Sequence, residues 1–162
     1  MSRFRVGHGF DVHRFAPGRP LRLGGVHVPC EQGLEGHSDG DCAVHALCDA
    51  LLGAAAAGDM GQHFPSSDPR FKGADSLMFL EEVGRLLGRR GWAIENVDVT
   101  VIAQSPVLAP HLGPMREALS RRLGLAIDAV SVKAKSTDGL GALGRGEGVA
   151  AQATALLRSR DG

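Results

Sequence analysis

The 162-residue chain has no apolar run near the roughly 20 residues that a membrane-spanning helix needs. No signal-like apolar segment precedes the first polar motif, so we expect a cytoplasmic protein without membrane attachment. Neither sign of charge is in excess, because 18 Lys and Arg residues balance 18 Asp and Glu residues. Nucleic acid is therefore not an expected partner, and any anionic ligand must be held by a local site.

Cysteine is also scarce. Cys30, Cys42 and Cys48 are odd in number, and no pair has zinc-knuckle spacing, which predicts reduced thiols rather than a disulfide framework. None of the three lies in a recognisable nucleophile motif. The chain lacks a Gly-x-x-x-x-Gly-Lys-Ser/Thr loop, so a Walker-type nucleotide site is not expected. With cysteine nucleophile motifs and a Walker-type site excluded, metal-assisted phosphoryl transfer is the reaction class that remains.

What the chain does contain is an ordinary globular composition, 43% apolar and 22% charged, which predicts one domain over residues 1–162. Apolar residues alternate over positions 4–12, as in a strand, and residues 21–28 read as a hairpin around two glycines. A helix is expected to begin at Ser38 or Asp39, both good N-cap residues, and to run through Leu52.

The second half alternates helical and extended patterns. Helices are predicted over residues 75–90 and 110–123, and strands around 97–101 and 130–132. Residues 149–157 are ambiguous, because their alanines favour a helix locally whereas a closing strand suits the layout better. Strands interleaved with three helices predict an α/β or α+β sandwich.

Asp11, His13 and His45 form a candidate metal site. Two residues apart on a strand, Asp11 and His13 point the same way, and His45 is the best-placed third ligand. Three protein ligands and an open position are typical of catalytic zinc. The alternative, that Asp11 caps a turn and the histidines are ordinary polar residues, stays open. Asp49, one turn after His45, either orients its imidazole or is merely solvated or capping.

Two further segments offer groups for a phosphate. His37 and Ser38 precede the expected helix, whose N-terminus would present free N–H groups and a favourable dipole. Residues 133–138 combine hydroxyls, two lysines and the Asp138 carboxylate, which could hold magnesium beside phosphates. The alternative is a polar strand end and turn.

Several motifs occur in a specific order from about residue 5 to residue 157. They are Gly9-Phe10-Asp11-Val12-His13, His37-Ser38-Asp39-Gly40-Asp41, His45, Asp59-Met60-Gly61, Phe64-Pro65, Phe71-Lys72-Gly73-Ala74-Asp75-Ser76, Asn96-Val97-Asp98 and Gly144-Arg145-Gly146-Glu147-Gly148. Together they resemble the 2-C-methyl-D-erythritol 2,4-cyclodiphosphate synthase family of the non-mevalonate isoprenoid pathway.

The resemblance implies an α+β fold in a homotrimer, with a mixed sheet facing the threefold axis, helices outside, and active sites shared between neighbouring subunits. It implies a strand at residues 149–157. The expected enzyme is a lyase whose substrate, 4-diphosphocytidyl-2-C-methyl-D-erythritol 2-phosphate, is cyclised by attack of its own 2-phosphate on the β-phosphorus, with release of CMP.

The resemblance also implies a role for each matching residue. Asp11, His13 and His45 would bind Zn²⁺ or another divalent transition metal, Asp138 would bind Mg²⁺, and His37 and Ser136 would stabilise the transition state. The substrate-binding residues it implies are Ser38, Asp59, Met60, Gly61, Phe64, Pro65, Ser66, Ser67, Asp68, Ala103, Gln104, Ser105, Pro106, Val107, Leu108, Ala109, Ala134, Lys135, Thr137, Ala142 and Arg145.

Some positions depart from the commonest pattern of the family. Asp138 stands where glutamate is usual, one methylene shorter, and Ala142 stands where phenylalanine often lies in an axial cavity. Arg145 and Glu147 either form a second anion site or pair with each other. A metal-dependent phosphoesterase and a non-catalytic trimeric binding module are the competing interpretations of the whole chain.

Overall fold

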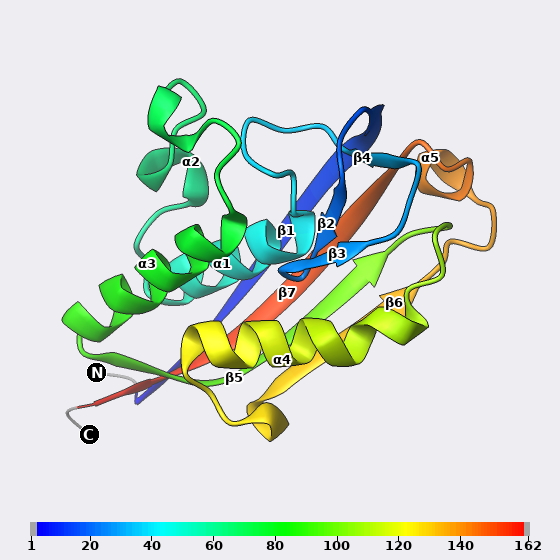
Figure 1. Cartoon of the computed structure of the whole chain (residues 1–162). Helices are drawn as coiled ribbons and strands as arrows, with labels where there is room; N and C mark the ends of the chain where they lie inside the picture. The colour runs from blue at the N-terminus through cyan, green and yellow to red at the C-terminus, as the bar shows by residue number, and fades with distance from the viewer. Residues whose placement is uncertain (1–2, 161–162) are drawn as a thin grey trace.

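A mixed five-stranded sheet forms the centre of the protein (Figure 1). The computed structural model describes residues 3–160, so the predicted domain's ends at 1–2 and 161–162 lie outside the described residues. The strand order is β4-β1-β7-β5-β6, in which β5 and β6 are parallel and the other neighbours antiparallel. The strands are β1 (Phe4–Pro17), β4 (Gln32–Leu34), β5 (Trp92–Ile102), β6 (Val130–Lys135) and β7 (Gly148–Ser159).

Three helices cover one face of this sheet, as Figure 1 shows. They are α1 (Cys42–Ala54), which packs on β1 and β7, α3 (Ser76–Arg89), and α4 (Leu112–Leu123), which packs on β6. The predicted hairpin is confirmed as β2 (Leu21–Leu23) and β3 (Val26–Val28). The α+β fold is therefore confirmed.

The connections contain short helical turns that the sequence patterns did not predict. They are α2 (Met60–His63), α5 (Gly141–Gly144) and three 3₁₀ turns over Pro69–Phe71, Ala109–His111 and Ile127–Ala129. No helix within residues 3–160 is long and apolar enough to cross a membrane.

The start of α1 differs from its prediction. The helix begins at Cys42 and Asp41 is its N-cap, so neither Ser38 nor Asp39 caps it. The Asp41 carboxylate is fully buried and accepts hydrogen bonds from the backbone of Val44, at 3.0 Å, and of Gly24 and Gly25, at 2.9 and 2.7 Å. Burial raises the pKa of Asp41, against these hydrogen bonds. One side chain thus caps α1 and fastens the β2–β3 hairpin to it.

The helix predictions at residues 75–90 and 110–123 are confirmed by α3 and α4. The helical alternative for residues 149–157 is wrong, because β7 pairs with β1 on one side and with β5 on the other. The alanines at 151, 153 and 155 are buried in the sheet beneath α1. Their small side chains suit this position, where a helix packs directly on the strand.

The side chains of β1 alternate between the two faces of the sheet. Gly7, Gly9, Asp11 and His13 face the helices, and the intervening residues face away. Four apolar side chains on the outer face are 46–68% exposed, namely Phe4, Val6, Phe10 and Val12. The sheet therefore presents an apolar row on the face that no helix covers among the described residues.

Helix α1 lies unusually close to β1. A Cβ atom added at Gly9 would lie 1.9 Å from the carbonyl oxygen of Ala46, and one at Gly7 would lie 1.9 Å from that of Ala50. Such separations are impossible for real side chains, so glycine is required at both positions. This close approach places His45, beside Ala46 on α1, against the inner face of β1.

We expect Gly9→Ala to destabilise the fold by about 3 kcal/mol, because the new methyl group collides with helix backbone that cannot move aside. Urea denaturation followed by circular dichroism measures the change. The matched control is Gly53→Ala in α1, the helix that packs on Gly9, because an added Cβ at Gly53 has open space. This control should be neutral or stabilising by about 1 kcal/mol, since alanine is the better helix former. Equal stability of the Gly9→Ala variant and the wild type would contradict the account.

Candidate metal centre and ligand cavity

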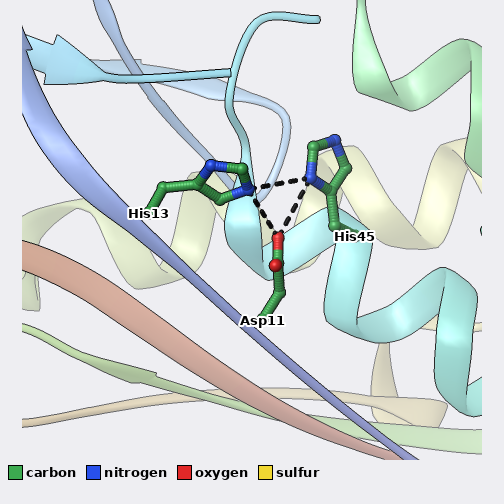
Figure 2. A group of neighbouring side chains, drawn as sticks. All are labelled: Asp11, His13 and His45. Carbon is green, nitrogen blue, oxygen red and sulfur yellow. Dashed lines mark hydrogen bonds and ion pairs between the residues drawn. The ribbon is translucent and has the colours of Figure 1, made fainter. Parts of the chain in front are cut away.

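Asp11 and His13 from β1 and His45 from α1 converge, as the sequence predicted (Figure 2). Asp11 Oδ2 lies 2.8 Å from His13 Nε2 and 3.1 Å from His45 Nδ1, and the two nitrogen atoms are 3.4 Å apart. Among residues 3–160, this is the cluster of three His, Cys or acidic side chains with ligand atoms close enough to share an ion.

The cluster fits a zinc ion in both chemistry and spacing. Two imidazole nitrogens and one carboxylate oxygen are typical zinc ligands. Tetrahedral bonds of about 2.0–2.2 Å place ligand atoms about 3.3–3.6 Å apart, and the observed separations of 2.8, 3.1 and 3.4 Å approach this range, with Asp11 and His13 the closest pair. The side chains are partly buried, so the cluster can bind an ion and still admit a ligand.

The His13 imidazole is held in one orientation. Its Nδ1 lies within hydrogen-bond distance of the Glu35 carbonyl oxygen, which can only accept. Nδ1 therefore carries the hydrogen in the neutral ring, and Nε2 offers its lone pair toward Asp11 and His45.

The carboxylate and the imidazoles perturb each other's protonation. Burial alone would raise the pKa of Asp11, but hydrogen bonds from the imidazolium forms of His13 and His45, together with their charges, hold it well below its ordinary value. The hydrogen bond to Asp11 raises the pKa of His13, and burial opposes this shift. Without a metal, the pair is stabilised as carboxylate and imidazolium.

A cavity of about 390 Å³ opens beside the cluster. It is lined by Asp11, His13, His37, Ser38, His45, Asp49, Met60, Gly61, Phe64, Ser66, Phe71 and Phe79. Asp59, Pro65, Ser67 and Asp68, also predicted to bind substrate, are outside this lining. Asp59 caps α2 by accepting from Gln62 N, and Asp68 caps the next turn and pairs with Arg70.

His37 and Ser38 reach the cavity from a loop rather than from the N-terminus of α1. The Nε2 atom of His37 donates to the Asp68 carbonyl at 3.0 Å. Arg19 holds the loop by donating to the carbonyl of Gly36, at 2.7 Å, and to that of Ser38. No sequence pattern points to Arg19, because it precedes Gly36 by 17 residues and belongs to no motif.

Two predicted segments form a second group at the ends of two parallel strands. Residues 103–109 follow β5, and residues 134–138 end β6 and begin its loop. The side chain of Gln104 joins the two loops by accepting from Gly139 N at 3.0 Å. None of these residues lines the 390 Å³ cavity. One chain thus brings most of the predicted residues together in two groups, and Ala142 and Arg145 belong to neither.

Asp138 has a left-handed backbone conformation, with φ of 52°. Aspartate tolerates this region better than most residues because its short side chain bonds locally. Here Ser136 Oγ donates to Asp138 Oδ1 at 3.2 Å. The predicted magnesium ligand thus lies next to Ser136.

Of two expected contacts, one differs from its prediction and the other agrees with one of its two alternatives. Asp49 does not orient His45: its carboxylate accepts from Met60 N at 2.8 Å, whereas the hydroxyls of Ser76 and Ser38 contact His45 Nε2. Arg145 pairs with Glu147 at 2.6 Å on the surface, in agreement with the pairing alternative. Ala142 lines a separate cavity of about 560 Å³ that also includes Val12, His13 and Phe15.

Comparison with known proteins places this arrangement in a family. The model of the YgbB family matches residues 4–158, nearly the whole chain. The chain belongs to the YgbB family.

Two curated relatives of this YgbB member carry the same name. A 2-C-methyl-D-erythritol 2,4-cyclodiphosphate synthase from Pseudomonas aeruginosa is 54% identical over 156 residues, covering 96% of this chain and 99% of the relative. One from Burkholderia thailandensis is 56% identical over 154 residues, covering 95% of each chain. A solved structure of such a synthase in a CDP-bound form is 40% identical, with a TM-score of 0.87 and coverage of 94% and 99%.

We expect zinc affinity to rise with pH between pH 6 and 8. The raised pKa of His13 means that zinc must displace a proton from its imidazole, whereas Asp11 is already ionised in this range. As the pH rises through the pKa of His13 this competition disappears, so affinity should rise by up to about tenfold per pH unit.

Competition with a chromogenic chelator, calibrated at each pH, measures this slope. His27→Gln removes an exposed imidazole from β3, outside the cluster, and should leave the slope unchanged. An affinity that does not vary between pH 6 and 8 would contradict the proposed competition.

Proposed function

We propose that this protein converts 4-diphosphocytidyl-2-C-methyl-D-erythritol 2-phosphate to 2-C-methyl-D-erythritol 2,4-cyclodiphosphate and CMP, as a lyase of non-mevalonate isoprenoid biosynthesis. The observation that carries the proposal is the intact Asp11, His13 and His45 cluster in a chain 54–56% identical, over nearly its full length, to synthases of that name. The CDP-bound synthase structure supports a cytidine nucleotide as part of the substrate.

Asp11, His13 and His45 would hold zinc, and Asp138 would hold magnesium. When bound, these ions supply Lewis acids that polarise phosphoryl oxygens and neutralise phosphate charge. The donor set and spacing of the cluster support the zinc assignment. The magnesium assignment rests on the match of Asp138 to the resembling family.

The reaction asks the protein mainly for positioning, because attacker and target belong to one molecule. An oxygen of the 2-phosphate forms a bond to the β-phosphorus while the bond from that phosphorus to the bridging oxygen breaks, and the bridging oxygen leaves with CMP. His37 and Ser136 are assigned as donors to the charge on the transferring group. Ser38 is assigned to the methylerythritol phosphate.

Phenylalanine rings give the cavity an apolar wall. The Phe64 and Phe79 centroids lie 4.6 Å apart, and Phe71 packs edge-on against both. We assign this wall to the carbon skeleton of the methylerythritol unit, with Met60 and Gly61 beside it. The loop at residues 103–109 is assigned to cytosine, and residues 134–137 to the phosphates beside Asp138.

A homotrimer with shared sites accounts for two observations. The apolar row on the outer face of β1 is exposed in one chain, and such a row marks an association surface. The loops assigned to cytosine and magnesium lie outside the lining of the cavity that holds the metal cluster. A neighbouring subunit would supply those loops and complete the site. The cytoplasmic location stays a prediction from the sequence.

Product analysis tests the reaction. With the diphosphocytidyl substrate, zinc and magnesium, ³¹P NMR should show the cyclic diphosphate and CMP in equal amounts. Linear hydrolysis products would indicate a phosphoesterase instead, and no CMP release would indicate a binding module.

We expect His45→Ala to lower turnover about a hundredfold or more by removing a metal ligand, without changing the size of the assembly. His27→Ala is the control and should retain full activity.

Mixing two inactive variants tests the shared site. His45→Ala removes one residue of the metal cluster. Ser136→Ala removes one residue of the second group, the loops that follow β5 and β6. In mixed trimers, about one site in three would combine two undamaged groups from different subunits, so part of the activity should return. Co-expression with two affinity tags isolates the mixed species. Isolated mixed trimers without restored activity would show that each site is built within one chain.

A further inference from the structure

We propose that Ser76 and Asp39 are positioning residues that fix which nitrogen of the His45 imidazole carries its hydrogen, and so direct Nδ1 toward the metal. The inference rests on the zinc site proposed above and assigns a role to two residues that neither bind the ion nor line the cavity.

The contact of Ser76 with His45 is short and buried. Ser76 is the first residue of α3, is fully buried, and places its Oγ 2.8 Å from His45 Nε2. The same hydroxyl is hydrogen-bonded to Asp39 Oδ1. The serine oxygen thus lies between a carboxylate and an imidazole nitrogen.

Asp39 can only accept in this arrangement. Its Oδ2 faces the N–H of Ser76 at 3.0 Å, and its Oδ1 faces the N–H of Asp41 at 3.1 Å. An ionised carboxylate has no hydrogen to give. The single hydroxyl hydrogen of Ser76 must therefore be donated to Asp39.

This assignment fixes the imidazole. With its hydrogen committed to Asp39, the Ser76 oxygen presents only lone pairs to His45 and must accept the Nε2 hydrogen. In the neutral ring Nδ1 then carries the lone pair, and Nδ1 is the atom that lies 3.1 Å from Asp11 Oδ2 and 3.4 Å from His13 Nε2. The opposite tautomer would donate from Nδ1 to Asp11 at 3.1 Å, but it would place two lone pairs only 2.8 Å apart at the shorter Nε2 contact.

The two histidines thus carry their hydrogens on different ring nitrogens. His13 donates from Nδ1 to the Glu35 carbonyl and ligates through Nε2, whereas His45 donates from Nε2 and ligates through Nδ1. Such partners of ligand histidines commonly change metal affinity by about 10- to 100-fold.

The assignment also separates this cluster from a serine-hydrolase triad. Residues 36–40 fit the Gly-x-Ser-x-Gly pattern, and Ser38 Oγ lies 3.2 Å from His45 Nε2, which is opposite Asp11 on the ring. A triad base needs a free lone pair at Nε2 to take the serine proton. Since Nε2 already carries a hydrogen, Ser38 is not activated as a nucleophile.

The tautomer can be read directly by two-bond ¹H–¹⁵N NMR of ¹⁵N-histidine-labelled, metal-free protein, at a pH where His45 is neutral. Assigned by comparison with His45→Ala, the His45 signals should show the Nε2–H form in the wild type. Ser76→Ala should mix the two forms and weaken zinc binding by about 10- to 100-fold in a chelator competition. Asp39→Asn offers an amide donor in place of an acceptor and should shift His45 further toward the Nδ1–H form.

Ser120→Ala is the matched control. It removes another buried serine hydroxyl, on α4 and outside the cavity lining, which donates to the Leu125 carbonyl after the helix. It should leave both the His45 signals and the zinc affinity unchanged. If Ser76→Ala does not fold, the wild-type spectrum alone decides.

An Nδ1–H form in the metal-free wild type would overturn the proposal, as would wild-type zinc affinity in Ser76→Ala. A wild type that binds no zinc would overturn the metal site itself. This failure is distinguishable, because the tautomer is measured without metal.

Discussion

The close approach of α1 to β1 is the constraint on which the rest of the structure depends. Gly7 and Gly9 let the carbonyls of Ala50 and Ala46 lie almost on the strand, and the alanines of β7 continue this shallow surface beside them. Any side chain at the two glycines would lift the helix. The imidazole of His45 would then move away from Asp11 and His13 on β1. The helix packing and the metal cluster therefore both require glycine at these two positions.

How much the sequence predicted depends on the range of the interactions involved. Asp11 and His13 were predictable together because a strand repeats every two residues. Helices α3 and α4 were predictable because their apolar stripes and end residues are local signals. The alanines of β7 favour a helix in isolation, and they form a strand because a central position in the sheet and a helix packed above it override that preference.

The failures concern contacts between segments far apart in sequence. Asp39 looks like a helix cap, but its carboxylate bonds to Ser76, 37 residues later, and Asp41 caps α1 instead. Asp49 looks like a partner for His45, but the turn after α1 brings the Met60 amide to it. Such contacts leave no periodic pattern. The family resemblance identified residues of both predicted groups, although one chain does not place both groups in one cavity.

The position of β7 has a consequence for how the protein is made. This strand is the last element of the chain, yet it lies between β1 and β5 and supplies hydrogen bonds to both. During synthesis, the first strand therefore has no partner on that side until more than a hundred residues have followed it. Pairing across such a separation is slow. The sheet that carries two of the three metal ligands is therefore completed only after translation has passed β7.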